Sequence, residues 1–230
     1  MPAIIPPTVW CDYLSWLSYA VPGMLDRRNV DAMDYALQRL PSNAPLLEIG
    51  SFCGLSTCVL SFLIRKHRLP NRLFTCDSWL FEGQVLGAPL AEGTTVTHDE
   101  YRRFVQESFR RNVSTFCSDR LPQTIESDSG EFFELWSANA AKADVFGHPA
   151  QLGGPISFAY IDGCHAYDGA KRDFENTDRF LVPGGFILFD DSGDGSGWEV
   201  CRVIEEILAA SRYELISHNP NYLFRKIPNP

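Results

Sequence analysis

The sequence predicts an α/β fold built on a doubly wound sheet of seven mostly parallel strands, with helices on both faces and an antiparallel edge at the C-terminal end. Three observations support this prediction. Short strand-like runs alternate with helix-like segments along most of the chain. Apolar residues follow one another in these runs and do not alternate with polar ones. Several of the runs end in an acidic residue. Continuous apolar strands are typical of parallel sheets, which are buried on both faces.

Length and composition indicate a globular protein with one core. The chain has 230 residues, of which 45% are hydrophobic and 21% are charged. The net charge is −9 and no long basic run offsets it, so we expect no nucleic-acid partner. No apolar run is long enough to cross a membrane, so no membrane partner is expected either. The 7 cysteines form no Cys-x-x-Cys pair, which favours small buried thiols in a cytoplasmic protein.

Residues 1–45 precede the first strand and are predicted to form an N-terminal helical extension. The aromatic-rich segment 10–19 predicts a short helix that lies on the body of the protein or on a second copy, so a homodimer through this region is one expectation. Residues 29–40 predict a second helix, because their apolar side chains recur at helical spacing.

The first strand, residues 46–49, leads into a turn between two glycines and then into a helix over residues 55–66. Gly50 and Gly54 allow the backbone to approach a ligand closely, and the helix N-terminus presents unpaired N–H groups. This Gly-x-x-x-Gly spacing differs from that of dinucleotide-binding folds. Glu48 would repel a diphosphate but suits a positively charged group, such as the amino group of S-adenosylmethionine. The alternative is an ordinary strand–turn–helix with a structural acid.

The run Leu47-Glu48-Ile49-Gly50-Ser51-Phe52-Cys53-Gly54-Leu55-Ser56 resembles the first motif of class I methyltransferases, in particular the catechol O-methyltransferase branch and its bacterial small-molecule relatives. The resemblance implies a Rossmann-like fold that binds S-adenosyl-L-methionine. Within this run it implies that the donor site contains Glu48, Gly50, Ser51, Gly54 and Ser56.

The second strand, residues 72–77, ends in an acid. In a doubly wound sheet the carboxylate of Asp77 lies where a ribose binds and can accept hydrogen bonds from its hydroxyls. The alternative is a cap for the next helix. Ser78 and Trp79 follow and are counted with the donor site; the indole either covers a ligand or belongs to the core.

Residues 79–120 are too long for a simple connection. Their first half contains several glycines and a proline, and residues 98–112 read as a helix. Loops at the carboxyl ends of strands carry specificity in such folds, so we interpret this insertion as a substrate lid. The alternative is a surface insertion without a role.

A weak third strand at 121–126 is followed by Ser127 and Asp128, which open a helix. The resemblance implies that Asp128 accepts a hydrogen bond from the adenine amino group and that Ser127 lies beside it. A helix N-cap is the alternative for Asp128. Residues 137–155 read as a polar connection.

The fourth and fifth strands, 156–162 and 186–191, end in Asp162 and in the pair Asp190-Asp191. These strands are expected to be neighbours, so the three carboxylates should meet at the carboxyl edge of the sheet. Clustered carboxylates repel one another unless a proton or cation holds them, and oxygen ligands favour Mg²⁺ or another hard divalent cation. The alternative is three unrelated caps and loop acids.

The segments 160–167 and 181–191 resemble the second signature of metal-dependent small-molecule O-methyltransferases, which include enzymes that methylate sugar hydroxyls of macrolide and aminocoumarin antibiotics. The resemblance implies that Asp162, Asp190 and Asp191 are metal ligands, with Asp162 also beside the donor. Catechol enzymes carry a lysine three residues after the first ligand, where this chain has His165. His165 is therefore the leading candidate for a general base, and Asp190 is the second.

The chain closes with a helix at 198–210 and an antiparallel strand pair, 213–217 and 222–226, so residues 46–230 are expected to form one methyltransferase domain. We expect a Mg²⁺-assisted O-methyltransferase that acts on a hydroxyl of a small natural-product or sugar-type molecule. Two alternatives are a nicotinamide oxidoreductase, which the glycine spacing disfavours, and a non-catalytic scaffold, which the clustered acids disfavour.

Overall fold

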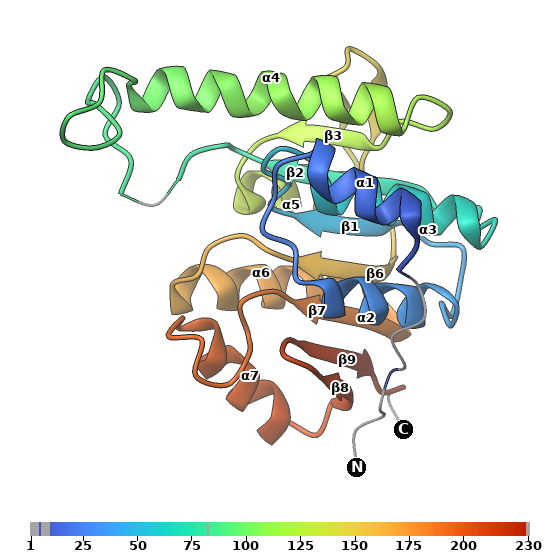
Figure 1. Cartoon of the computed structure of the whole chain (residues 1–230). Coiled ribbons are helices and arrows are strands. Elements are labelled where there is room, and N and C mark those ends of the chain that lie inside the picture. The colour runs from blue at the N-terminus through green and yellow to red at the C-terminus, as the bar shows by residue number, and fades with distance from the viewer. Residues whose placement is uncertain (1–4, 6–9, 82, 229–230) are drawn as a thin grey trace.

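The computed structural model describes residues 5, 10–81 and 83–228. Its main sheet lies at the centre of the molecule (Figure 1) and, within this described part, has seven strands in the order β3-β2-β1-β6-β7-β9-β8. The strands from β3 to β7 are parallel, and β9 runs antiparallel to both of its neighbours. The strands of this sheet are β1 (Leu46–Ile49), β2 (Leu73–Asp77), β3 (Gln123–Glu126), β6 (Ile156–Ile161), β7 (Leu181–Phe189), β8 (Tyr213–His218) and β9 (Tyr222–Lys226).

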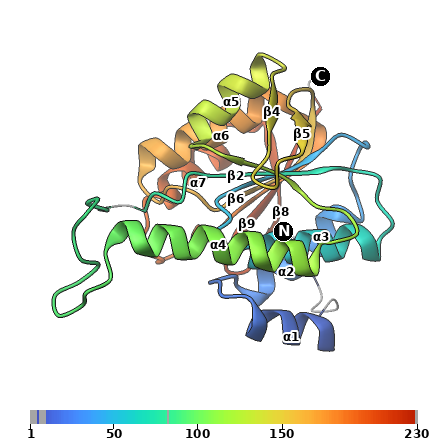
Figure 2. The ribbon, with the colours of Figure 1, turned by 90° about the horizontal axis from the view of Figure 1, so that it is seen from above.

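Helices cover both faces of the sheet, as Figure 2 shows in a view along its edge. One face packs against α1 (Asp12–Ala20), α2 (Arg27–Leu37), α3 (Leu55–Lys66) and α4 (His98–Phe116). The other packs against α5 (Ser129–Ser137), α6 (Tyr167–Phe180) and α7 (Val200–Ala209). Successive residues of β1 enter different cores, Leu46 the first and Leu47 the second, because side chains alternate along a strand. The predicted doubly wound sheet with an antiparallel edge is confirmed.

Local signals explain where the helices begin. The second helix starts at Arg27, two residues earlier than predicted, because Asp26 accepts a hydrogen bond from Arg28 N at 2.7 Å and caps it. At α4 the side chains of Thr97 and Glu100 form a capping box. This helix continues to Phe116, four residues beyond its predicted end at residue 112.

Two connections differ from the prediction. The segment 137–155 is not a plain connection, because it contains a hairpin of β4 (Ala141–Ala143) and β5 (Pro149–Gln151). Strand β7 begins at Leu181, five residues before its predicted start at residue 186, and includes the Pro183-Gly184-Gly185 run. Its register shifts there, since Ile156 pairs with Leu181 but Phe158 pairs with Phe186, and residues 182–185 bulge out.

The insertion after β2 has two different parts. Helix α4 belongs to the body of the protein, because Val105, Phe109 and Val113 are buried in the core that covers the sheet. The preceding loop, ending at residue 97, projects beyond the start of α4 (Figure 1). A lid role can therefore apply to this loop but not to the helix.

Among the described helices, none combines the length and the apolar character that a membrane crossing requires.

The cysteines are free thiols, and four of them, Cys53, Cys58, Cys76 and Cys117, are buried. Burial raises the pKa of the Cys76 thiol, which fits the expected role of small core side chains.

Candidate functional site

The turn between β1 and α3 requires both of its glycines. Gly50 has a φ of 84°, and a Cβ atom there would overlap the main-chain carbonyl oxygen of Asp162 at the end of β6. Gly54 has a φ of 92°, and its Cβ would come within 3.0 Å of Val113 Cγ2 on α4. This left-handed backbone and these close approaches favour glycine. The turn thus packs closely between the end of β6 and α4.

Asp77, at the end of β2, holds this turn. Its Oδ2 accepts hydrogen bonds from Ser51 N at 2.7 Å and Phe52 N at 2.9 Å, and its Oδ1 accepts one from Trp79 N at 2.6 Å. Burial raises the pKa of the Asp77 carboxyl, and the three N–H donors oppose that rise. The carboxylate predicted to bind a ribose therefore already fixes the loops on either side of it.

Glu48 lies beneath the turn and is fully buried. Its Oε2 accepts hydrogen bonds from Thr57 Oγ1 at 2.5 Å and Ser51 Oγ at 3.4 Å. Burial raises the pKa of Glu48 from 4.5 to about 7, and the hydroxyls of Ser56 and Thr57 oppose the rise. Within the described residues Oε1 has no hydrogen-bond partner. One oxygen is thus left for a further donor.

Trp79 takes the core alternative. Its side chain is 1% exposed, donates from Nε1 to the carbonyl oxygen of Phe52 at 2.9 Å, and packs against Phe109 with ring centroids 5.3 Å apart. An indole buried in this way supports the turn. Ser78 lies at the start of the projecting loop, where its carbonyl oxygen accepts from Arg102 Nη2 at 2.9 Å.

Ser127 and Asp128 follow β3 at the same edge of the sheet. Ser127 N donates to the carbonyl oxygen of Asp77 at 3.2 Å, which places the two strand ends side by side. The Ser127 hydroxyl is buried and has no hydrogen-bond partner in the described part of the chain. Asp128 is the N-cap of α5, because its Oδ1 accepts from Glu131 N at 3.0 Å. The capping role expected as an alternative for Asp128 is present.

A second group of side chains lies at the ends of β6 and β7. Asp162, His165 and Asp191 each offer a ligand atom, and these atoms all lie within 4.8 Å of one another. His165 Nε2 is 2.9 Å from Asp191 Oδ2, and the imidazole stacks on Trp198 with ring centroids 4.4 Å apart. Two carboxylates and an imidazole at this spacing could hold a metal ion.

The electrostatics of this group favour a cation. Burial, together with the negative charges of Asp190, Glu48 and Asp191, raises the pKa of Asp162 well above its ordinary value. Among the described residues, no lysine or arginine forms an ion pair with Asp162 or Asp191; the ion-pair partner of Asp191 is His165. A proton or a cation would relieve this repulsion.

Asp190, which follows β7, accepts hydrogen bonds at both of its carboxylate oxygens. Its Oδ1 accepts hydrogen bonds from Asn29 Nδ2 at 2.8 Å and Asn221 Nδ2 at 2.5 Å, and its Oδ2 accepts one from Tyr160 Oη at 2.5 Å. The compact group contains His165 where the predicted trio of carboxylates contained Asp190. Neighbouring donors thus engage both oxygens of Asp190.

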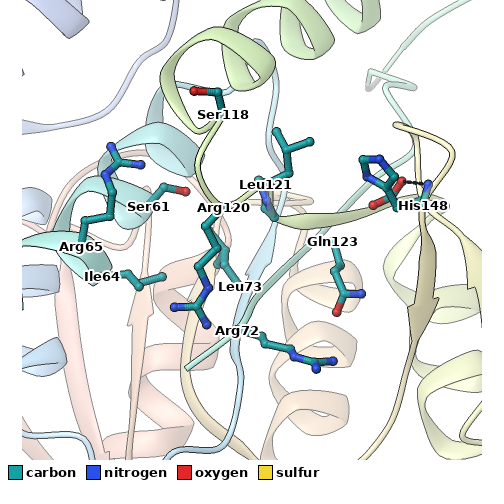
Figure 3. A pocket seen from close by; sticks show the side chains of 12 residues that line it. Ser61, Ile64, Arg65, Arg72, Leu73, Ser118, Arg120, Leu121, Gln123 and His148 are labelled. Carbon is teal, nitrogen blue, oxygen red and sulfur yellow. Dashed lines mark hydrogen bonds between the residues drawn. The ribbon is translucent and has the colours of Figure 1, made fainter. Parts of the chain in front are cut away.

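A cavity of about 430 Å³ lies at the opposite, amino-terminal edge of the sheet (Figure 3). Arg65, Arg72 and Arg120 line it. Arg65 pairs with Asp119, and Arg120 donates to carbonyl oxygens of residues 69–71. The guanidinium groups of Arg65 and Arg120 are thus engaged in contacts within the protein. The cavity contains none of the predicted site residues.

Comparison with known sequences gives one family match. The family described as a methyltransferase domain matches residues 47–192, a span that includes the glycine turn and both acids after β7. No curated protein sequence shows significant similarity to the chain.

Several solved structures share the fold. An O-methyltransferase from Bacillus cereus, solved in complex with SAH, has a TM-score of 0.58 and 14% identity, over 96% of this chain and 93% of the other. The calicheamicin methyltransferase CalS11 has a TM-score of 0.57 and 16% identity, over 88% and 79%. The O-methyltransferase NovP has a TM-score of 0.57 and 17% identity, over 90% and 82%. At such identities the likeness is one of fold.

Proposed function

The chain belongs to the methyltransferase-domain family, and from this premise we propose that it is an S-adenosyl-L-methionine-dependent O-methyltransferase acting on a hydroxyl group of a small molecule. One observation carries the proposal. Asp162 belongs to both parts of the site, the glycine turn and the acidic group. Its main-chain carbonyl oxygen lies against Gly50, and its carboxylate belongs to the group with His165 and Asp191. A donor on the turn and an acceptor on the acidic group would therefore be neighbours, and such proximity lowers the barrier to transfer.

The residues of the turn fit the proposed donor. S-adenosyl-L-methionine would supply an electrophilic methyl group on a sulfonium centre. Two buried polar atoms that have no hydrogen-bond partner among the described residues, Glu48 Oε1 and the Ser127 hydroxyl, lie near the carboxyl ends of β1 and β3, the two strands that flank β2, and could bond to polar groups of the donor. Trp79 is not included, because its indole is buried in the core. The donor site that we propose consists of Glu48, Gly50, Ser51, Gly54, Ser56, Asp77, Ser78, Ser127, Asp128 and Asp162.

The acidic group fits a hard divalent cation such as Mg²⁺. Carboxylate oxygens are the ligands that such ions prefer, and the raised pKa of Asp162 indicates that negative charge there lacks compensation. Asp162 and Asp191 would hold the cation, with Asp190 or His165 as a further ligand. A cation bound there would lower the pKa of an acceptor hydroxyl.

We assign the removal of the acceptor proton to His165. Asp191 lies 2.9 Å from its Nε2 and Trp198 stacks on its ring, so the imidazole is fixed in orientation. Asp190 is the weaker candidate, because its two oxygens already accept hydrogen bonds from Asn29, Asn221 and Tyr160.

Methyl transfer can be tested without knowing the acceptor. The protein would be incubated with methyl-labelled S-adenosylmethionine, Mg²⁺ and a pool of hydroxylated small molecules, with and without a chelator. We expect label in the small-molecule fraction, loss of transfer with chelator, and recovery on adding Mg²⁺. Donor binding without any transfer would favour a non-catalytic protein, and transfer that persists in chelator would contradict the cation.

Two further proposals concern surfaces. The projecting loop up to residue 97 is proposed to close over bound ligands. Slower amide exchange with donor and acceptor would support this closure, and unchanged exchange would contradict it.

The N-terminal region is proposed to pair two copies, because Trp16 and Tyr19 on α1 are exposed. A monomer in light scattering would contradict this pairing.

A further inference from the structure

Two asparagines that are far apart in the sequence meet on one carboxylate. Asn29 lies in the first turn of α2, and Asn221 lies immediately before β9. Both donate from Nδ2 to Oδ1 of Asp190, and Asn221 Nδ2 also lies 3.1 Å from Asn29 Oδ1. Their exposed fractions are 1% and 6%, so these bonds are shielded from water. The N-terminal extension thus contributes directly to the floor of the proposed site.

Asn221 also binds the backbone that follows Asp191. Its Oδ1 accepts hydrogen bonds from Ser192 N at 3.0 Å and Gly193 N at 3.1 Å. The same amide group therefore binds the turn before and after Asp191. Asp190 adds a third constraint, because its Oδ1 accepts from Asp191 N at 3.0 Å.

This turn holds Asp191 in an unfavourable backbone conformation. Asp191 has a φ of 50°, in the left-handed region that residues other than glycine adopt infrequently. Such a conformation persists only where surrounding contacts determine it. Here those contacts come from Asn221 and Asp190, and the result is that the Asp191 carboxylate faces His165 and Asp162.

We propose that Asn29 and Asn221 are positioning residues of the cation site, acting through Asp190 on the turn that presents Asp191. The inference rests on the proposed function, because it concerns the divalent cation assigned there. Neither asparagine is expected to touch donor or acceptor. Loss of partners that orient metal ligands typically weakens metal binding by about 10- to 100-fold.

A purely stabilising role is the competing explanation, and the chain offers a matched control. Asn71 is also 1% exposed, and its Nδ2 donates to the carbonyl oxygens of Ser42 at 2.9 Å and Ala44 at 2.6 Å. It lies next to the amino end of β2, at the opposite edge of the sheet from the site. Asn71→Ala removes a buried amide of the same kind without touching Asp190.

The test measures Mn²⁺ binding by calorimetry, with free Mn²⁺ followed by electron paramagnetic resonance, on the full chain. Asn221→Ala is expected to weaken Mn²⁺ binding at least tenfold, and Asn29→Ala less, because Asn29 does not hold the chain after Asp191. Affinity for S-adenosylhomocysteine should stay within about twofold of wild type in both, and Asn71→Ala should leave both affinities unchanged while lowering the melting temperature. Asn221→Ser, which keeps a donor in a smaller side chain, serves if Asn221→Ala does not fold.

Three outcomes would overturn the inference, and they also separate it from the proposed function. Asn29→Ala and Asn221→Ala proteins that bind Mn²⁺ as wild type does would refute the positioning role alone. An equal loss of Mn²⁺ affinity in Asn71→Ala would show that general destabilisation is the cause. A wild-type protein that binds S-adenosylhomocysteine but not Mn²⁺ would remove the cation site and this inference, leaving the methyltransferase assignment intact.

Discussion

The main-chain carbonyl oxygen of Asp162 occupies the space that a Cβ atom on Gly50 would need. Two adjacent parallel strands therefore meet at a point where only glycine fits, and the two parts of the proposed site share that point. The contact couples the shape of the donor turn to the position of the Asp162 carboxylate. A substitution that moves the turn should therefore also move the Asp162 carboxylate, and a substitution that moves the carboxylate should move the turn.

Gly50→Ala should both destabilise the protein and weaken donor binding. The new side chain meets a left-handed backbone and overlaps the Asp162 carbonyl oxygen. Gly87→Ala is the control, because Gly87 also has a positive φ, 79°, but no heavy atom within 4 Å of its ideal Cβ. Chemical denaturation should show a cost of about 1–2 kcal/mol for Gly87→Ala, and about 1–3 kcal/mol more for Gly50→Ala. Equal costs would mean that the contact with Asp162 relaxes freely.

Asp77→Asn should weaken S-adenosylmethionine binding by about 1–3 kcal/mol. The amide would lose the charge and turn an N–H₂ group toward backbone N–H donors of the turn or of Trp79. The dissociation constant can be measured by equilibrium dialysis with labelled donor. Asp119→Asn, an exposed acid paired with Arg65 near the opposite edge, should leave it unchanged. Wild-type affinity in Asp77→Asn would remove Asp77 from the donor site.

Glu48 should make the unliganded protein less stable as the pH rises. Its pKa is 4.5 in the reference state and about 7 when buried, so the folded protein keeps a proton that the unfolded chain has lost. The contribution of this group to stability is therefore full below pH 4.5 and is lost as the pH rises to about 7, a change of about 3 kcal/mol. Asp162 and Asp190, whose pKa values are also raised, act in the same direction.

Glu48→Gln tests this dependence, because the amide cannot ionise. The free energy of unfolding, measured by urea denaturation between pH 4.5 and 8, should decrease less in the variant than in wild type. Parallel curves for the two proteins would show that Glu48 does not take up a proton on folding in this range.

His165→Gln should lower the rate of methyl transfer by about 10²–10⁴-fold, the usual contribution of a general base. Donor affinity should not change, because His165 is not among the residues proposed to bind the donor. His148→Gln, a histidine that lines the cavity at the opposite edge, should retain full activity. Mn²⁺ affinity distinguishes the two roles of His165: it stays unchanged if the imidazole acts as the base and falls if the imidazole is a ligand. A fully active His165→Gln protein would contradict the assignment of the base.

The sheet could be predicted from sequence because its signals are local. The apolar runs ending at Ile49, Asp77 and Phe189 each mark a strand, and the acids at the ends of the last two mark the carboxyl edge. The hairpin at 141–151 was missed because its strands have three residues each, too few to show a period. The start of β7 was misplaced at residue 186, because a bulge accommodates Pro183-Gly184-Gly185 within the strand.

The site was less predictable, because its contacts join distant segments. The positions of Asp162, Asp190 and Asp191 at strand ends predicted that the three carboxylates meet, but not that side chains from α2, β6 and the last turn engage Asp190. Single asparagines such as Asn29 and Asn221 carry no spacing signal in a sequence. The donor roles that the resemblance implies remain predictions.

We propose that the turn from Gly50 to Gly54, with Asp77 behind it, binds S-adenosylmethionine. Calorimetric titration of the wild-type protein in Mg²⁺ tests it most directly, with NADH titrated in parallel because a nicotinamide cofactor is the rival ligand of this fold. We predict that one equivalent of S-adenosylmethionine binds, that S-adenosylhomocysteine competes with it, and that NADH gives no heat of binding. Binding of NADH, or no binding of either adenosyl compound, would contradict the account.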